Sequence, residues 1–332
     1  MFKDKKVLVI GGTGTIGQAL VEKILLEEPS VVRIYSRDEY KQFILKERLG
    51  EQPNIRYLLG DVRDKERLNR AMNDIDIVFN LAALKHVPAC EYDPFEAVKT
   101  NVLGTQNVIA CAMENRVKRV IYSSTDKAVS PTNTMGATKL LAERLMSSAQ
   151  YSRGDADTIF ASVRFGNVMG SRGSVIPLFK QQIIEKGHIT VTEPEMTRFM
   201  MSLSQAVELT IKACKIAKGG EVFVLKMPVV RLKDLAEVII DDMCQKSNLN
   251  RNEIEIKKIG LRPGEKMYEE LMSEDESTKA VELEDMFIIN PPYNEYIYPE
   301  SKGIAKGNYS SHHEKVLTKA EIKMLLETER LL

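Results

Sequence analysis

The sequence has no excess of charge of either sign and no long apolar run. Among its 332 residues, 47 are Lys or Arg and 47 are Asp or Glu, so the formal net charge at pH 7 is zero. A neutral chain has no overall field to attract nucleic acid or an anionic membrane surface, and any recognition of phosphate must therefore be local. No segment approaches the roughly 20 apolar residues that cross a bilayer. We therefore expect neither a nucleic-acid partner nor a membrane span.

Cysteine is scarce. The four cysteines, Cys90, Cys111, Cys214 and Cys244, are far apart, and none has CxxC spacing. This pattern predicts free thiols in a reducing compartment, with neither a disulfide framework nor a metal site. The first six residues lead directly into a strand-like run and lack the charged, apolar and small-residue pattern of a signal peptide. A cytoplasmic protein is therefore expected.

Short β-branched runs alternate with longer helical patterns in the first half of the chain. Strands are predicted at 6–10, 31–35, 55–59, 75–80, 118–123 and 158–163, and helices at 15–28, 39–48, 64–73, 93–115 and 135–150. This alternation is typical of βαβ units and predicts a parallel, doubly wound sheet with helices on both faces. The 43% of apolar residues suffices for a sizeable core.

The alternation of strand and helix patterns becomes less regular after about residue 165. Strand-like runs at 189–192, 221–225 and 254–259 alternate with helical patterns at 175–186, 204–217 and 231–246, and a last helix is predicted at 318–330. The segment 274–312 is rich in Pro, Asn, Tyr, Ser and Gly and predicts an extended, partly mobile tail. We therefore predict an α/β protein with a domain over 1–165, to which some later segments return, and a smaller α/β domain with a tail over 166–332.

A glycine-rich turn joins the first predicted strand to the first predicted helix. Its sequence is Gly11-Gly12-Thr13-Gly14-Thr15-Ile16-Gly17, in which three glycines recur at three-residue spacing. Such glycines let the backbone turn sharply and approach a pyrophosphate, which then lies at the positive N-terminal end of the helix. Because a strand precedes the turn and a helix follows it, residues 1–165 are expected to form a dinucleotide-binding Rossmann domain.

The end of the second predicted strand bears on the choice between NADP and NAD. It reads Tyr35-Ser36-Arg37-Asp38. A Ser-Arg pair suits a ribose 2′-phosphate because guanidinium binds phosphate through two hydrogen bonds, whereas an acid suits the unmodified ribose. We therefore favour NADP. The alternative is that Asp38 binds the ribose of NAD and that Arg37 is a solvated charge.

Two further strand ends supply candidates for the cofactor site. Asp61 and Val62 follow the third strand, where the carboxylate can accept a hydrogen bond from the adenine amino group while Val62 packs on the ring. Leu81-Ala82-Ala83-Leu84-Lys85 follows the fourth strand. The small side chains there let a dinucleotide pass close to the backbone, because ligands of open α/β sheets bind at the carboxyl ends of the strands.

The fifth strand ends in a concentration of chemically capable side chains. The run Ser123-Ser124-Thr125-Asp126-Lys127 is followed eight residues later by Met135-Gly136-Ala137-Thr138-Lys139. Lys139 shares a helix face with Met135, and its ammonium can bind the nicotinamide ribose and lower the pKa of nearby acids. A surface ion pair in a loop is the alternative for Asp126 and Lys127.

These motifs resemble those of extended short-chain dehydrogenases/reductases, and more closely those of nucleotide-sugar 4,6-dehydratases that act on UDP-N-acetylglucosamine. The resemblance covers nearly the whole chain. Its other motifs are Arg164-Phe165-Gly166-Asn167-Val168, Gly170-Ser171-Arg172-Gly173-Ser174-Val175-Ile176-Pro177, Met196-Thr197-Arg198-Phe199 and Arg262-Pro263-Gly264-Glu265-Lys266. Met135 stands where this layout usually carries a tyrosine. Because methionine cannot transfer a proton, the Tyr-Lys proton relay cannot operate unmodified.

The resemblance implies a three-step reaction. The C4 hydroxyl is oxidised by hydride transfer to the nicotinamide, water is eliminated across C5–C6, and the hydride returns to C6. It implies that protonated Asp126 donates to the departing hydroxyl, that neutral Lys127 removes the C5 proton, and that Thr125 binds the C4 oxygen. Burial beside another cation would give Lys127 the lowered pKa that this role requires. For the C4 base we favour Asp126, with Lys127 or a water held by Thr125 as alternatives.

The resemblance also implies binding sites. The predicted cofactor set is Gly11, Thr13, Gly14, Thr15, Ile16, Gly17, Ser36, Arg37, Asp61, Val62, Leu81, Ala82, Ala83, Lys85, Asn101, Ser123 and Lys139. The predicted substrate set is Lys85, Asn167, Val175, Thr190, Arg198, Arg262 and Glu265. Two arginines of this set suit the two phosphates of a nucleotide sugar, and the glutamate suits its ribose hydroxyls.

Some alternatives stay open. A homo-oligomer and a role in surface polysaccharide or glycan sugar synthesis are what the resemblance implies. The sequence leaves open inversion or retention at C5, a GDP-sugar in place of the UDP-sugar, and an epimerase or reductase in place of a dehydratase. A non-catalytic cofactor-binding protein is the alternative outside enzymes, and the missing tyrosine is the feature that favours it.

Overall fold

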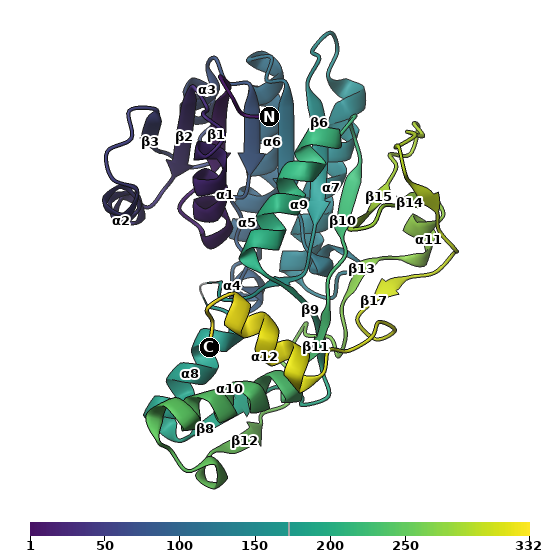
Figure 1. Cartoon of the computed structure of the whole chain (residues 1–332). Helices are drawn as coiled ribbons and strands as arrows, with labels where there is room; N and C mark the ends of the chain where they lie inside the picture. Colours follow the sequence, from purple (N-terminus) through teal and green to yellow (C-terminus); the bar gives the residue numbers. More distant parts are fainter. Residues whose placement is uncertain (172) are drawn as a thin grey trace.

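The computed structural model describes residues 1–171 and 173–332, so Arg172 of the 170–177 motif lies outside the described residues. A ten-stranded sheet forms the centre of the molecule (Figure 1), with the strand order β16-β14-β15-β10-β6-β5-β4-β1-β2-β3. The seven strands from β10 to β3 pair in parallel. The order 3-2-1-4-5-6 of the first six strands is that of a dinucleotide-binding sheet, so the predicted α/β doubly wound fold is confirmed.

The first half of the chain alternates strands and helices as predicted. Its elements are β1 (Lys6–Ile10), α1 (Thr15–Leu25), β2 (Val31–Ser36), α2 (Glu39–Leu49), β3 (Ile55–Leu59), α3 (Lys65–Met72), β4 (Ile77–Asn80), α4 (Val87–Tyr92), α5 (Pro94–Ala97), α6 (Gly104–Glu114), β5 (Arg119–Ser123), α7 (Thr134–Ser152) and β6 (Ile159–Arg164). The helix predicted over 93–115 is confirmed over residues 94–114, where a π-helical segment (Val98–Leu103) joins α5 to α6 without a break.

Local sequence explains where helices begin. Side-chain oxygens of Asp38, Asp64 and Asn133 accept hydrogen bonds from backbone N–H groups in the first turns of α2, α3 and α7. These bonds satisfy donors that have no partner within the helix. The strands β1 and β4 are almost wholly apolar and buried, as expected for strands covered on both faces.

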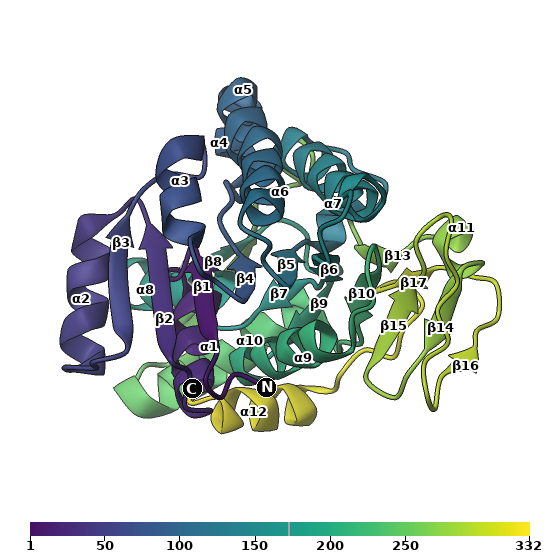
Figure 2. The same cartoon turned by 90° about the horizontal axis from the view of Figure 1, so that it is seen from above.

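Two apolar layers cover the sheet. One side carries α1 and α9 (Leu203–Ile216), and the other carries α3, α6 and α7 (Figure 2). Val9 and Ile34 point into the first layer, whereas Leu8 and Ile10 point into the second. This alternation along β1 follows from the two-residue period of a strand.

The second half of the chain builds a smaller unit and also returns to the sheet. Its remaining elements are β7 (Asn167–Val168), α8 (Val175–Lys186), β8 (His188–Val191), β9 (Thr197–Met201), β10 (Val222–Leu225), β11 (Val229–Arg231), α10 (Leu232–Ser247), β12 (Glu255–Lys258), β13 (Glu270–Met272), α11 (Glu274–Ser277), β14 (Ala280–Glu282), β15 (Met286–Ile289), β16 (Lys302–Gly303), β17 (Tyr309–Ser310) and α12 (Lys319–Thr328).

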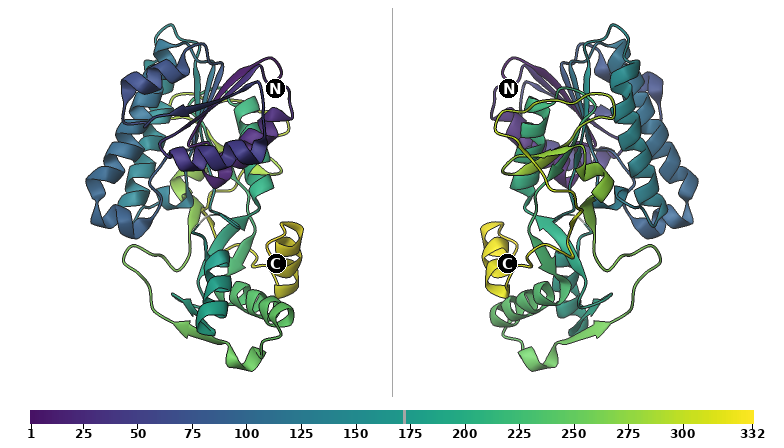
Figure 3. Two further views of the ribbon diagram at one scale, coloured as in Figure 1. Left: turned by 90° about the vertical axis from the view of Figure 1, so that its left-hand side faces the viewer. Right: turned by 90° about the vertical axis from the view of Figure 1, so that its right-hand side faces the viewer.

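The smaller unit consists of the β11-β9-β7 and β12-β8 sheets with α8, α10 and α12. It has its own apolar cluster, which includes Ile176, Phe179 and Ile239. Figure 3 shows this unit below the large sheet, with the N-terminus of the chain in the upper part and the C-terminus in the lower part.

The prediction of an extended, partly mobile tail over 274–312 is wrong for residues 280–289. Strands β14 and β15 pair with each other and β15 pairs with β10, all antiparallel, so they widen the main sheet. The paired residues Val281 and Ile288 carry the apolar side chains of these strands. Such short strands, which only three residues separate, give too few residues for a clear periodicity.

Candidate active site

A cavity of about 1110 Å³ runs along the carboxyl ends of the parallel strands. Ile10, Ser36, Leu81, Ser123 and Phe165, which lie at or just after the ends of β1, β2, β4, β5 and β6, all line it. This is the edge of a doubly wound sheet at which ligands bind. The volume exceeds the roughly 300–1,000 Å³ of an ordinary ligand pocket, which fits a site for two ligands.

The glycine-rich loop forms one end of this cavity. Gly11 has a φ of +78°, and its N–H donates to the Tyr35 carbonyl at 2.8 Å. A Cβ on Gly17 would lie 2.4 Å from the Gly11 carbonyl oxygen, so this glycine is needed for α1 to pack on the turn. The arrangement leaves the N-terminus of α1 facing the cavity, as a pyrophosphate site requires. Thr13, Gly14, Thr15 and Ile16 also line the cavity.

The end of β2 presents more positive than negative charge. Ser36, Arg37 and Lys41 line the cavity, and the Ser36 hydroxyl lies 2.8 Å from that of Thr13. Asp38 lines it too, but its carboxylate accepts from the Lys41 N–H as the N-cap of α2 and pairs with the Lys41 ammonium at 2.6 Å. Asp38 is thus already engaged by its own helix.

Two residues of the predicted cofactor set lie behind the cavity wall. The Asp61 carboxylate binds Arg63 at 2.7 Å and Arg37 at 3.3 Å, while its neighbour Val62 lines the cavity. Asn101 is buried, and its amide exchanges hydrogen bonds with the Leu84 backbone and donates to Thr138. Asn101 therefore fixes the segment after β4. The other residues predicted there, Leu81, Ala82, Ala83 and Lys85, line the cavity.

Asp126, Lys127 and Glu269 form a cluster of charged groups at the middle of the cavity. One Asp126 oxygen, Oδ1, accepts from the Thr125 hydroxyl at 2.8 Å and from the Lys127 ammonium at 3.0 Å. The ammonium lies 3.4 Å from Glu269 Oε1. Thr125, Lys127 and Glu269 line the cavity, whereas the fully buried Asp126 carboxylate lies behind them against Gly166.

The charge state of Lys127 differs from the expectation. Burial by itself lowers the pKa of the ammonium, but the carboxylates of Asp126 and Glu269 outweigh it, and the pKa of Lys127 is raised. The predicted lowering of this pKa is therefore wrong for the structure, because two anions and not a second cation dominate the surroundings.

Glu269 is not among the residues that the sequence predicts for the site. Its side chain is buried, lines the cavity, and lies 3.9 Å from the Arg198 guanidinium. Burial raises the pKa of its carboxyl group, and Asp126 reinforces the effect. One signal was available in the sequence: Glu269 stands two residues before the apolar Leu271, and the two-residue period of a strand places both on one buried face.

Met135 and Lys139 line the cavity from one face of α7. Met135 packs with Cys90 and Ala97. The Lys139 ammonium donates to the Ser123 carbonyl and lies 4.3 Å from the centre of the Tyr122 ring. Burial lowers the pKa of Lys139 to about 7, against the opposing effect of Glu143.

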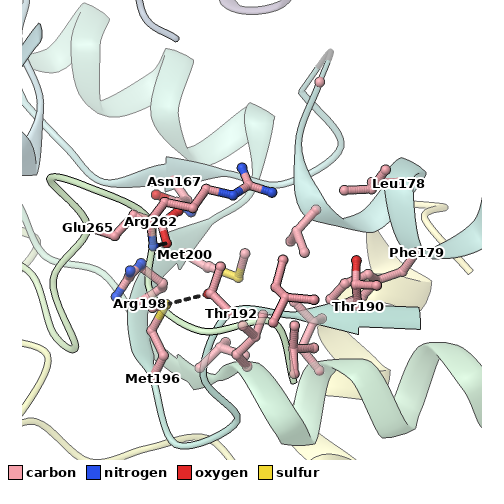
Figure 4. Close-up of a pocket in the computed structure, with 17 residues that line it drawn as sticks. Asn167, Leu178, Phe179, Thr190, Thr192, Met196, Arg198, Met200, Arg262 and Glu265 are labelled. Carbon is pink, nitrogen blue, oxygen red and sulfur yellow. Dashed lines mark hydrogen bonds between the residues drawn. The ribbon is translucent and has the colours of Figure 1, made fainter. Parts of the chain in front are cut away.

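The other end of the cavity contains the predicted substrate residues. Arg198, Asn167, Val175 and Glu265 line both this cavity and a smaller one of about 220 Å³ that continues from it (Figure 4), Thr190 and Arg262 line the smaller one, and Lys85 lines the larger. Arg198 is held by bonds to the carbonyls of Thr197 and Lys266 at 2.7 and 2.8 Å.

The smaller cavity combines charged and apolar walls. Figure 4 shows Arg198, Arg262, Glu265 and Asn167 gathered at one side, away from Phe179. Its apolar wall, which the sequence analysis did not assign, comprises Leu178, Phe179, Met196, Met200, Val230, Leu232, Leu235 and Ile259. A ligand with an anionic part and a flat, less polar part fits this division.

No described helix is long and apolar enough to cross a membrane. Within residues 1–171 and 173–332, no group of three or more His, Cys, Asp or Glu side chains is arranged to hold a metal ion.

Comparisons with known proteins agree with this architecture. The family described as "Polysaccharide biosynthesis protein" matches residues 7–291. The UDP-N-acetylglucosamine 4,6-dehydratase (inverting) of Campylobacter jejuni is 43% identical over 294 residues, covering 88% of this chain and 84% of its own. A UDP-glucose 4-epimerase of Rickettsia rickettsii is 41% identical over 338 residues, covering 99% and 97%.

A solved structure agrees over the full length. The X-ray structure of Pen from Bacillus thuringiensis is 55% identical, with a TM-score of 0.94, and the match covers 100% of this chain and 99% of that one. The chain therefore belongs to the polysaccharide biosynthesis protein family, within the extended short-chain dehydrogenases/reductases that include nucleotide-sugar dehydratases and epimerases.

Proposed function

We propose that the protein is an NADP-dependent 4,6-dehydratase that converts UDP-N-acetylglucosamine into a 4-keto-6-deoxy sugar nucleotide. The observation that carries the proposal is the cluster of Asp126, Lys127 and Glu269, of which Lys127 and Glu269 line the same cavity as Met135. Proton-transferring groups lie between an end that fits a dinucleotide and an end with arginines for a diphosphate. The identity with the Campylobacter dehydratase supports the substrate.

The chain's own residues would move the protons of this reaction. A nicotinamide cofactor, which the glycine-rich loop and Lys139 would hold, would supply the hydride chemistry at C4 and C6. The Thr125 hydroxyl faces the cavity and donates to Asp126, so the C4 hydroxyl proton can reach the buried carboxylate through Thr125 and later return to the departing C6 hydroxyl. Lys127 faces the same space and removes the C5 proton when it is neutral.

The alternative activity is 4-epimerisation, which the names of the Rickettsia relatives raise. Both reactions begin by oxidising C4, but an epimerase must return the hydride to C4 and the proton to the C4 oxygen. Met135, at the position of the usual tyrosine, lines the cavity and has no proton to exchange. Elimination requires acid–base groups at C5 and C6 in addition to the one at C4, whereas epimerisation does not. The cluster of Asp126, Lys127 and Glu269 offers such groups, which favours the dehydratase.

The first prediction tests this proposal directly. Purified protein incubated with UDP-N-acetylglucosamine and NADP should give a product that has lost one water, detected by mass spectrometry, and NMR in heavy water would give the configuration at C5. Asp126→Asn and Lys127→Ala should each reduce dehydration by about 10²-fold or more, because each removes an acid–base group. Met135→Ala should be far milder.

Two outcomes would contradict the assignment. Near-normal turnover of Asp126→Asn would remove that carboxylate from the proton route. Release of UDP-N-acetylgalactosamine without loss of water would establish epimerisation instead. Two comparison substrates test specificity: UDP-glucose changes only the sugar, and GDP-N-acetylglucosamine changes only the base.

The second prediction concerns the cofactor. Arg37 and Lys41 face the site beside β2, and Asp38 is engaged as a helix cap, so the charge there suits a 2′-phosphate. Arg37→Ala should weaken NADP binding about tenfold or more, the effect of losing one charge-assisted contact, and leave NAD binding nearly unchanged. Titration by fluorescence measures both. Arg48→Ala, which removes an arginine paired with Glu22 on the surface, is the control. Equal losses for the two cofactors would favour NAD.

A further inference from the structure

Glu269 occupies a position that the proposed chemistry does not yet use. It directly precedes β13, and its N–H donates to the Ser311 hydroxyl at 3.0 Å while its carbonyl accepts from the Ser311 N–H at 2.9 Å. These bonds fix the backbone, and the side chain reaches the cavity wall beside Lys127. The structure thus holds a second carboxylate against the same ammonium that Asp126 contacts.

The two oxygens of this carboxylate differ. Oε1 lies 3.4 Å from the Lys127 ammonium and 3.9 Å from the Arg198 guanidinium. Oε2 is buried and, among the described residues, has no hydrogen-bond partner. A buried carboxylate oxygen without a partner is costly, and a proton on the group reduces that cost.

The surrounding charges bear on where that proton resides. Glu269 is faced by Lys127, Arg198 and Lys266, which favour its anion, and by Asp126, which disfavours it. Burial is the largest effect, and the pKa of Glu269 is raised above that of an ordinary glutamate. Lys127 is faced by the same two carboxylates and by Arg198. An ion pair in such surroundings lies close in free energy to the neutral pair that one proton transfer creates.

We propose that Glu269 is a positioning residue that accepts the excess proton of Lys127 and so converts the lysine into the neutral base of the elimination step. This inference rests on the proposed dehydratase function. The structure otherwise poses a conflict: the base at C5 must be an amine, yet both carboxylates hold Lys127 as an ammonium. Substrate entry removes water from the cavity, which disfavours the two separate charges further.

The step balances without another reactant. One N–H bond of the ammonium breaks, and its electron pair stays on Nζ as the lone pair of the amine. An O–H bond forms on the Glu269 carboxylate, and no atom changes its oxidation state. The amine then takes the C5 proton, and Lys127 is again an ammonium beside a carboxylic acid. That acid can return its proton to solvent or substrate before the next cycle.

The test compares Glu269→Gln with wild type while C4 oxidation and C5 proton removal are followed separately. Transient absorbance of the reduced cofactor reports the first, and exchange of C5–H for deuterium in heavy water reports the second. Glu269→Gln should oxidise C4 at a rate within about threefold of wild type but exchange C5–H about 10²-fold more slowly at neutral pH, the size of a lost proton-transfer partner. Its exchange rate should rise about tenfold per pH unit, because Lys127 must now lose its proton to solvent.

Matched variants complete the experiment. Glu270→Gln changes the next residue of β13, whose carboxylate binds Asn308, and should match wild type. Glu269→Asp keeps an acid and should restore part of the exchange at a pH dependence like that of wild type. The inference is overturned if Glu269→Gln keeps the C5–H exchange rate and pH dependence of wild type. It is also overturned if Glu269→Gln slows C4 oxidation and C5–H exchange equally and Glu269→Asp restores neither.

A separate measurement distinguishes failure of this inference from failure of the proposed function. If wild type does not dehydrate UDP-N-acetylglucosamine, the function is wrong whatever Glu269 does. Labelling of Lys127 by an amine reagent, read by peptide mass spectrometry across pH, needs no substrate. Removing the negative neighbour in Glu269→Gln should shift labelling of Lys127 to lower pH, and Glu270→Gln should not. Unshifted labelling in Glu269→Gln overturns the pairing of the two groups.

Discussion

Lys139 is a buried cation beside a carbonyl and an aromatic ring. Its pKa of about 7 lies below the ordinary 10.5, because burial disfavours the charged form. Between these two values the unfolded chain binds the proton and the folded chain does not. The free energy of unfolding therefore rises with pH across this window, by at most about 1.4 kcal/mol per pH unit. Below pH 7 both states are protonated and the contribution to the slope disappears.

The third prediction follows from this rise of the free energy of unfolding with pH. Lys139→Met removes the titrating group, so the stability of wild type relative to this variant should increase from pH 7 to pH 10. Urea denaturation without cofactor at intervals of one pH unit measures the difference. Lys118→Met, at an exposed lysine paired with Asp76, is the control and should follow wild type. Parallel stability curves for wild type and Lys139→Met would show that the ammonium stays protonated in the folded protein.

The sequence predicts the surroundings of some site residues better than those of others. The glycines of the first turn have a fixed context of strand and helix, and their positions follow from it. Asp126 and Lys127 are neighbours in sequence, so their proximity was certain, but the direction of the Lys127 pKa shift depends on Glu269, which arrives from more than 140 residues away. A local pattern contains no information about such a partner.

The turn between β1 and α1 illustrates how single atoms shape an element. A Cβ on Gly17 would lie 2.4 Å from the Gly11 carbonyl oxygen and 2.7 Å from the Gly12 Cα, and these are backbone atoms that cannot turn aside. A Cβ on Gly14 meets only the Gly11 oxygen, at 3.2 Å. The two glycines therefore serve different purposes: Gly17 lets the helix pack, and Gly14 leaves the N-terminus of α1 open.

The fourth prediction separates these purposes. Gly17→Ala should lower the free energy of unfolding by about 1–3 kcal/mol in the absence of cofactor, as expected for overpacking against a rigid backbone. Gly14→Ala should cost less than about 1 kcal/mol but weaken NADP binding, because the methyl group lies where a pyrophosphate approaches the helix. Urea denaturation and fluorescence titration measure the two effects. Equal destabilisation by both substitutions would contradict the assignment.

At the level of elements, the parallel half of the sheet was predictable and its antiparallel extension was not. Strands β1 to β6 are apolar runs of four to six residues separated by helices, a pattern that few other folds produce. Strands β14 and β15 have three and four residues and lie between loops, so the pairing of β15 with β10, and of β14 with β15, is decided by the exposed edge of the sheet. That edge exists only once the rest of the fold has formed.

At the scale of the molecule, the two units meet at the cavity, and the C-terminus of the chain supports one of its walls. Leu331, just beyond α12, lies so close to Gly170 that a Cβ on the glycine would be 2.6 Å from the leucine Cδ2. Gly170 lies between β7 and α8, and Ser171, Gly173 and Ser174 of the same stretch of sequence line the large cavity. Leu331 thus lies against a segment that bounds the end of the cavity proposed for the substrate.

The fifth prediction is that Leu331→Ala weakens binding of the sugar nucleotide without weakening that of the cofactor. Loss of this packing should let the turn before α8 move, raising KM by about threefold to tenfold, equivalent to roughly 0.7–1.4 kcal/mol. NADP affinity should stay constant because the glycine-rich loop lies at the other end of the cavity. Met324→Ala, at an exposed position of α12, is the control. A loss of both affinities, or of neither, would show that Leu331 acts through overall stability or not at all.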